Sequence, residues 1–477
     1  MDGSTKKLHP MKYDRILFIV IIICSIYAVV VSTWKFWLIC EILLFFVLVI
    51  SFSNGLRDLL NIHSVAISLI FLYSLPSTIS ILQGKIVLME NELLMLFSSL
   101  FIGFAGYTLG ALYFKRLFIS ENKYNARFSQ KINSLFWLAY KYRYVLVLIL
   151  CIVLFHWGFM IRGMSYRESI LYRMETQGTM QYIKLLIPTV FSALMIAMIT
   201  IIGDLKKNKK LSLLSYLLII LVVLSIIGGH RIWIIGLFIC LLLSFQSYLK
   251  RRHMILIIIS VIFMSIILSG GIRYARVGYS FLENIKRFYN YFSDVAKQMT
   301  FRDLMWEWSI FNTPFSTFIT LIENIPKNIS FDYSAYVKDL SLLVPTVIYR
   351  NRPLPYNQWY VSVFNPELFQ IGGGKTFFVV GFGHLFAGRL GVLIHLFLFG
   401  FLFDGIYKYF KKIGGAAGLF LYSYFFIQLF NFAVGYGFIA FIKTSIIMNF
   451  IIPISLLFLF ILILDLVNPR KLLMRTT

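Results

Sequence analysis

Arginines are the residues whose type and spacing most clearly suggest chemistry in this chain. Arg231 ends the sequence Gly228-Gly229-His230-Arg231, between two apolar segments that almost touch. Arg273 and Arg276 are three residues apart and share one face if their segment is helical. Guanidinium forks grip phosphate oxygens in pairs, so this pattern favours a catalytic diphosphate site. The alternative is that these side chains only anchor segment ends among lipid head groups.

Further arginines lie in or beside the segments that follow. The additional candidates for binding a diphosphate or a glycan are Tyr349, Arg350, Arg352, Arg389, Arg162 and Arg167. Arg350 and Arg352 stand between Pro345 and Pro353, where a solvated charged turn is the alternative interpretation. Arg162 and Arg167 could instead neutralise nearby glutamates.

Two histidines are candidates for proton transfer, because imidazole titrates near neutral pH. His384 lies where a long polar segment returns to an apolar one, which leaves room for a substrate to approach. His230 is crowded by two apolar segments and is assigned to binding. The sequence therefore predicts His384 as the catalytic base; packing or spacing roles are the alternative for both. The spacing of His, Asp and Glu fits no metal site, so we expect neither a metal nor a cofactor.

The unusually hydrophobic composition of the chain indicates what kind of structural elements position these residues. Hydrophobic residues make up 59% of the 477 residues and charged residues only 14%, whereas a soluble domain of this length needs about a quarter of its residues charged. A soluble fold is therefore excluded. The net charge of +25 points to anionic lipid head groups and an anionic lipid-linked substrate, rather than to nucleic acid.

Apolar segments of about 20 residues can cross a bilayer as helices. The predicted spans are residues 15–32, 36–53, 65–83, 93–114, 144–161, 184–203, 211–228, 232–248, 254–271, 386–405, 416–436 and 444–465. The sequence thus predicts an all-α polytopic membrane protein with about twelve transmembrane helices.

Lys and Arg in the connecting segments predict the orientation of these spans. With a cytoplasmic N-terminus, 25 of the 45 cations fall on the cytoplasmic side and eight in short outer segments. Both termini are then cytoplasmic. The expected organisation is nine spans in residues 1–271, a large extracytoplasmic loop in 272–385, and three spans with a basic tail in 386–477. Within the loop we expect a helix over 301–321 and irregular structure over 344–375.

Several of these motifs occur together in a known layout. Gly-Gly-His-Arg opens one span, an arginine pair closes the next, and Pro345 to Pro353 encloses Arg-x-Arg in a large outer loop. Gly381-Phe-Gly-His-Leu-Phe-Ala-Gly388-Arg then leads into a span. Across residues 140–410 this arrangement resembles the O-antigen polymerase family (Wzy-type oligosaccharide repeat-unit polymerases), which is related in layout to O-antigen ligases. Phe382 and His384 stand where related sequences often carry an acidic residue, which leaves the general base open.

The resemblance implies a C-type glycosyltransferase-like membrane fold and a role in polysaccharide biosynthesis, such as the O-antigen of lipopolysaccharide. The growing glycan would pass from undecaprenyl diphosphate to a second lipid-linked repeat unit, on the outer face of the bacterial plasma (inner) membrane. The implied partners are the lipid-linked donor and acceptor, membrane lipids, a chain-length regulator and a flippase, with no nucleic acid. Arginines would stabilise the diphosphate leaving group without a metal.

Two rival functions remain open from the sequence. An O-antigen ligase-like transferase shares the layout and the arginine chemistry, and differs in its acceptor. A flippase or transporter for the same lipid-linked unit belongs to a different class. Such carriers usually hold cations inside their spans and have short loops, whereas here cations cluster outside and one loop is long.

The split of cations between the two sides generates a labelling prediction. Single cysteines placed at residues 209, 251 and 410 should be shielded from an impermeant thiol reagent in intact cells, because the positive-inside rule places them in the cytoplasm. A cysteine at residue 330 should react. Labelling at residue 251 without labelling at residue 330 would show that the protein has the opposite orientation in the membrane.

Overall fold

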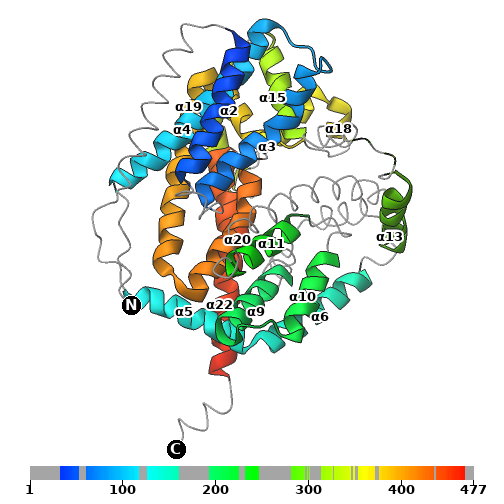
Figure 1. Ribbon diagram of the computed structural model, residues 1–477, viewed down its shortest axis with the longest axis vertical. Helices are drawn as coiled ribbons and strands as arrows, with labels where there is room; N and C mark the ends of the chain where they lie inside the picture. The colour runs from blue at the N-terminus through cyan, green and yellow to red at the C-terminus, as the bar shows by residue number, and fades with distance from the viewer. Residues whose placement is uncertain are drawn as a thin grey trace, which may run out of the picture. The chain divides into compact units, whose positions relative to one another are not determined.

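The computed structural model describes residues 33–52, 61–117, 126–160, 193–224, 231–245, 281–295, 298, 300, 313–325, 327–344, 348–349, 353–370, 375–433 and 437–467. Every regular element within these ranges is a helix (Figure 1), which confirms the all-α part of the predicted fold class.

Five helices in the described residues are long and apolar enough to cross a membrane, or six if one bent pair counts as a single span. They are Ile62–Leu82 (α3), Glu90–Tyr113 within α4 (Glu90–Leu117), Val379–Ile413 (α19), Gly415–Ala433 (α20) and Phe438–Leu466, which joins α21 (Phe438–Phe441), η3 (Ile442–Ile451) and α22 (Ile452–Leu466). Each coincides with a predicted span. These helices indicate a multi-pass membrane protein.

Other predicted spans correspond to helices that fall short of that test or to residues outside the described ranges. The helices are α2 (Trp34–Phe52), α6 (Arg143–Met160), α9 (Ala193–Asn208), α10 (Leu213–Leu224) and α11 (Arg231–Phe245). Predicted spans 15–32 and 254–271 lie outside the described residues. α6 is joined to α5 (Ala126–Lys141) through a bend of 62° between Arg127–Lys141 and Arg143–Ile152. Residues 126–141, which were expected to lie in a connecting loop, are thus helical. The physical reason is that their apolar residues recur at helical spacing.

The chain forms two compact units. Unit 1 comprises Met1–Ser120, Asn312–Ile406 and Phe432–Ala440, and unit 2 comprises Glu121–Phe311, Tyr407–Asn431 and Phe441–Thr477. The described helices of unit 2 include α13 (Phe281–Asn290) and η1 (Tyr291–Val295). The expected organisation into 1–271, 272–385 and 386–477 concerns membrane topology and stays a prediction.

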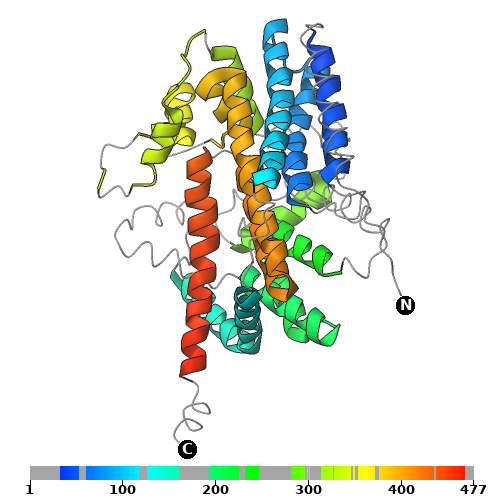
Figure 2. The same cartoon turned by 90° about the vertical axis from the view of Figure 1, so that its left-hand side faces the viewer.

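A sharp reversal breaks α19 near its start. Ala387 and Gly388 leave helical geometry, and Gly388 has φ +58°, a conformation that favours glycine. A Cβ on Gly383 would lie 2.6 Å from Val392 Cα, so the backbones of the two arms almost touch. Figure 2 shows the short first arm folding back beside the long second arm. The predicted span beginning at 386 is thus wrong at its start, because the chain reverses at Gly388 instead of running straight through.

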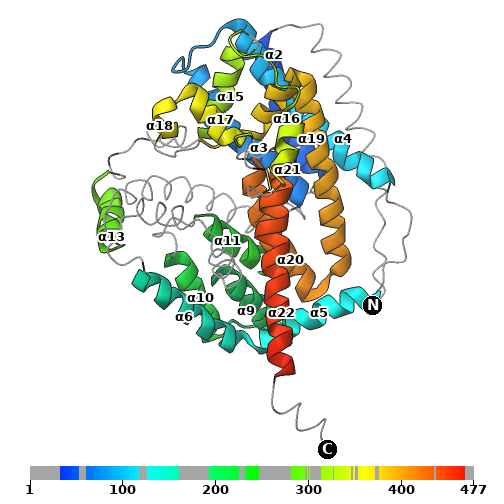
Figure 3. The same ribbon diagram turned by 180° about the vertical axis from the view of Figure 1, so that it is seen from behind.

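The loop segments pack onto this reversal. α15 (Thr313–Asn324), α16 (Ala335–Ser341) and α17 (Tyr356–Phe364) lie around the start of α19 (Figure 3). Buried residues of these segments and of α19 form one apolar cluster: Leu321, Ile325, Ala335, Tyr356, Tyr360, Val361, Phe377, Phe382 and Leu385.

The predictions for the secondary structure of the loop have mixed outcomes. α15 covers the end of the helix expected over 301–321, and residues 301–312 are outside the description. α17 and α18 (Pro366–Gln370) occupy part of the stretch expected to be irregular. That prediction was wrong because Pro355 and Pro366 stand at helix N-termini, where proline is well tolerated, rather than breaking helices.

Glycines let α4 and the long arm of α19 approach closely. Gly106-Tyr-Thr-Leu-Gly110 is a small-xxx-small pattern on α4, which is typical of tight helix pairs in membranes. A Cβ on Gly106 would lie 2.5 Å from the carbonyl oxygen of Leu393 and 3.1 Å from its Cα. Both contacts are to backbone, so no side chain can move aside to make room.

We therefore expect Gly106→Leu to force α4 away from α19 and to destabilise the protein by about 1–3 kcal/mol, the usual cost of overpacking. The measurement is thermal unfolding of the detergent-solubilised protein. Gly381→Ala is the matched control, because a Cβ there meets Leu321 at an ordinary 3.4 Å. Equal melting temperatures for the Gly106 and Gly381 variants would contradict this packing.

Candidate functional site

Only some of the predicted site residues are described. Arg273, Arg276, Arg350, Arg352, His230, Arg162 and Arg167 lie outside the described residues. Arg231 is the first residue of α11 in unit 2, and Tyr349 is exposed in unit 1. His384 and Arg389 both lie in α19, on opposite sides of its reversal. The predicted site can therefore be examined at His384 and Arg389.

His384 lies on the short arm of α19 and is fully buried. Its ring contacts Phe318 of α15 and Phe331 of the loop, with ring centroids 5.8 Å and 6.1 Å away. Among the described residues, neither ring nitrogen has a hydrogen-bond partner. The polar atoms of a buried imidazole are usually hydrogen-bonded. Because those of His384 are not, both nitrogens are available to a ligand or a water molecule.

Arg389 follows directly after the reversal at Gly388. Its Nε is buried and has no hydrogen-bond partner within the part of the chain that the structure describes. A guanidinium group has donors only, and a buried donor needs an acceptor. An anionic ligand would supply acceptors to this side chain. Phe331 closes over the reversal, since a Cβ on Gly388 would meet its ring at 3.4 Å. Phe331 thus packs against both His384 and Gly388.

Asp332 fixes that segment to the reversal. Its backbone N–H donates to the carbonyl oxygen of Leu385, the residue after His384, at 2.8 Å. Its carboxylate accepts hydrogen bonds from Ser334 Oγ at 2.6 Å, Lys338 Nζ at 2.8 Å and Tyr356 Oη at 3.0 Å. Burial alone would raise the pKa of Asp332, but these bonds outweigh it and lower the pKa. A fixed negative charge therefore lies on the segment that covers His384.

A second polar group joins α16 to the long arm of α19 and to the last spanning helix. Tyr336 Oη lies 2.6 Å from Nδ1 of His395, whose Nε2 has no partner in the described segments. Asp339 is fully buried, and its Oδ2 accepts the backbone N–H groups of Ile439 and Ala440 at 2.8 Å and 3.1 Å. Its carboxylate thus caps the first turn of α21 from a distant part of the chain.

A third polar group is buried among the spanning helices α3, α4 and α19. His63 Nδ1 lies 3.1 Å from Tyr107 Oη, and His63 Nε2 lies 3.3 Å from Oδ1 of Asp404. All three residues are buried. A carboxylate and an imidazole in apolar surroundings are costly unless they pair, and here each satisfies the other.

The sequence interpretation missed these polar groups. Asp332 carried a local signal, because Asp-x-Ser is a common turn in which the carboxylate accepts from the backbone N–H two residues on, as it does here at 3.2 Å. Asp339, His395 and Tyr336 carried none, since their partners are distant in sequence.

Chemically, the described site combines an unpartnered imidazole with a guanidinium group that lacks an acceptor. This pair suits an anion together with a hydroxyl that must lose a proton. Among the described residues no group of three His, Cys, Asp or Glu side chains is arranged to hold a metal ion. No protein-family model, curated protein or solved structure matches this chain.

Asp339 makes a testable contribution to stability. Burial raises its pKa from 3.8 to about 6, although the two backbone N–H groups oppose the shift. A raised pKa means that the folded state favours the protonated acid, so this contribution is present below about pH 4 and is lost as the pH rises through about 6.

We expect Asp339→Asn to keep the acceptor and remove the charge, and so to gain up to about 3 kcal/mol over the wild type between about pH 4 and pH 7. Asp339→Ala should lose the cap and cost about 1 kcal/mol. Thermal unfolding at both pH values measures these differences. Parallel stability curves for the wild type and the Asn variant would show that the carboxyl group does not titrate in this range.

Proposed function

We propose that the protein polymerises lipid-linked oligosaccharide repeat units of a surface polysaccharide such as O-antigen. The growing glycan is transferred from undecaprenyl diphosphate to a hydroxyl of the acceptor repeat unit. The bond between the anomeric carbon and the diphosphate breaks, the new glycosidic bond forms, and the hydroxyl proton goes to a base. This is a metal-independent glycosyltransferase reaction.

One observation carries the proposal furthest: the reversal of α19 at Gly388, with His384 and Arg389 on its two sides. At that point the long loop returns to an apolar helix. A substrate with a polar sugar and an apolar lipid needs a site at such a junction. Within the described ranges, the two nitrogens of the buried imidazole have no partner, and the buried Nε of the adjacent guanidinium has no acceptor. Both lie in unit 1, under loop segments that pack on the start of α19.

The residues have separate roles in this reaction. His384 accepts the proton of the acceptor hydroxyl, which requires the neutral imidazole. Arg389 binds the substrate. Arg231, Arg273 and Arg276 stabilise the charge that develops on the departing diphosphate, and Arg350, Arg352, Arg162, Arg167, His230 and Tyr349 contribute further contacts to the diphosphate or the glycan. About twelve spans with both termini in the cytoplasm would place these groups at the outer face of the bacterial inner membrane.

The experiment is complementation of the source strain from which the gene for this protein has been deleted, with lipid-linked glycans extracted and sized. His384→Gln, Arg273→Ala and Arg231→Ala should each abolish polymer and leave single repeat units on the lipid, at unchanged protein level in the membrane. Arg→Lys should rescue poorly, because lysine lacks the planar fork. His63→Gln is the control for losing a buried imidazole whose partners are known.

The same extracts separate the rival functions. If the deletion strain carrying an inactive variant accumulates long chains on undecaprenyl diphosphate, the protein is a ligase-like transferase. If single units are inaccessible to an impermeant glycan label on intact cells, it is a flippase. Polymer of normal length and amount in both the Arg231 and Arg273 variants would exclude the proposed diphosphate site. If the His384 variant still makes long polymer across a pH series, His384 is not the general base of the reaction.

A further inference from the structure

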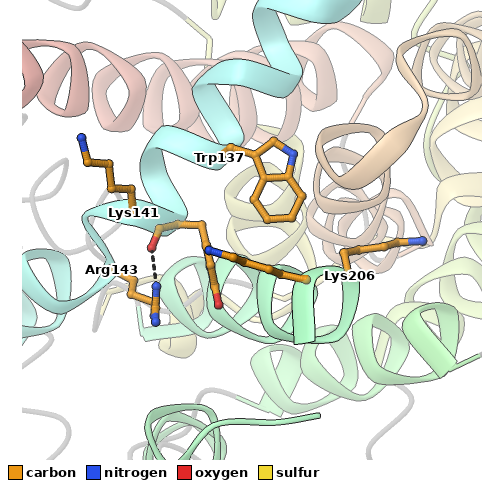
Figure 4. Close-up of a pocket in the computed structure, with 6 residues that line it drawn as sticks. Trp137, Lys141, Arg143 and Lys206 are labelled. Atoms are coloured by element: carbon orange, nitrogen blue, oxygen red, sulfur yellow. Dashed lines mark hydrogen bonds between the residues drawn. The ribbon is translucent and has the colours of Figure 1, made fainter. Parts of the chain in front are cut away.

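A cationic pocket in unit 2 has no role in the reaction proposed above. It has a volume of about 640 Å³ and is lined by Trp137, Tyr140, Lys141, Arg143, Lys206 and Lys207. The residues come from the end of α5, the start of α6 and the end of α9, as Figure 4 shows for the labelled side chains. This volume is in the range of small-molecule sites.

Arg143 is the most constrained cation of the pocket. Its guanidinium carbon lies 4.1 Å from the centre of the Tyr140 ring and 4.6 Å from that of Tyr144. Nη1 donates to the carbonyl oxygen of Tyr140 at 3.0 Å (Figure 4), while Nε is buried and has no partner among the described residues. Stacking between two rings holds the planar fork in place, which is the arrangement that suits a phosphate group.

The other cations add positive charge with little neutralisation. Lys206 and Lys207 are exposed and make no ion pair with a described residue. Lys141 is itself exposed and lies 3.7 Å from the carboxylate of the partly buried Asp465.

The acid next to the pocket is directed elsewhere. Asp204 on α9 is buried and accepts hydrogen bonds from the Tyr140 hydroxyl at 2.6 Å, the Ser215 hydroxyl at 2.7 Å and the Ser212 backbone N–H at 2.8 Å. Its carboxylate is therefore occupied by protein donors. Lys206 and Lys207 therefore remain available to an external anion, whereas Arg143 also donates to the Tyr140 carbonyl and the Tyr144 hydroxyl.

The surroundings of the pocket identify the source of that anion. From Arg143, α6 continues with an exposed apolar stripe of Tyr144, Leu148 and Ile152, one helical turn apart. α5 is amphipathic and bends into α6, and it carries Trp137 into the pocket wall. Aromatic side chains and cations beside an apolar helix face are typical of the level of lipid head groups. A soluble anion would leave the apolar stripe of α6 uncovered, whereas the acyl chains of a lipid would cover it.

We infer that this pocket binds the phosphodiester head group of an anionic phospholipid, with the acyl chains lying along the exposed stripe of α6. Residues 126–143 and 206–210 both belong to segments that the cation distribution assigns to the cytoplasmic side, so the lipid comes from the inner leaflet. Bound lipid would hold α5, α6 and α9 together at the membrane surface. This inference is independent of the proposed polymerase reaction.

The test is a lipid titration of the full-length protein in uncharged detergent, with phosphatidylglycerol as the probe and bound lipid counted by native mass spectrometry. Lys206→Gln/Lys207→Gln should weaken phosphatidylglycerol binding roughly thirtyfold, from the loss of two surface cations. Lys209→Gln/Lys210→Gln is the matched control: it removes the same charge beyond the end of α9 without touching the pocket, and it should keep the wild-type affinity. Phosphatidylcholine should bind more weakly than phosphatidylglycerol.

Lys141→Gln gives the same readout from α5 if the α9 double variant folds poorly. Three results would overturn the inference. They are unchanged binding in the pocket variants, an equal loss in the Lys209/Lys210 control, and displacement of phosphatidylglycerol by inorganic phosphate at a similar affinity. The last result would assign the pocket to a soluble anion.

Discussion

Polar groups placed inside this protein must find their partners within the chain, because lipid offers them none. The described residues show how this constraint is met. Asp404 and His63 satisfy each other between spanning helices. Asp204 collects three donors from its own unit. Asp339 accepts the N–H groups of the last spanning helix. In each case a group that is costly alone becomes a cross-link between segments that are far apart in sequence.

The same constraint shapes the reversal in α19. Breaking a helix frees backbone groups, so such a break is tolerated only where protein covers it. The loop supplies that cover: the Asp332 backbone N–H reaches the Leu385 carbonyl, and Phe331 packs over Gly388. Glycines at 383 and 388 permit the tight return of the chain. The loop is therefore a structural component of the membrane helix whose start it covers.

The sequence predicts the apolar helices well, because about twenty consecutive apolar residues have few alternatives to a spanning helix. The five longest apolar helices fall where the sequence places them. It does not predict the reversal at Gly388, since glycine is also common within spanning helices. Nor could it find the pairing of Tyr336 with His395 or of Asp339 with Ala440, because such contacts follow from packing between distant segments. His384 and Arg389 were proposed from local motifs alone, and their roles stay predictions.

The contrast between satisfied and unsatisfied polar groups separates structural residues from functional candidates. His63 has both ring nitrogens engaged and belongs to the framework. His384 is equally buried, yet neither of its nitrogens has a partner among the residues that the structure describes, and the same holds for the buried Nε of Arg389 beyond the reversal. Leaving such groups unpaired costs free energy that apolar side chains at the same positions would avoid. Nε2 of His395 and Nε of Arg143 also lack partners among the described residues, but the unpartnered atoms of His384 and Arg389 flank a single reversal of α19. A ligand that brings an acceptor for Arg389 and a hydroxyl donor for the neutral imidazole of His384 would satisfy both side chains, and the proposed substrate offers both groups.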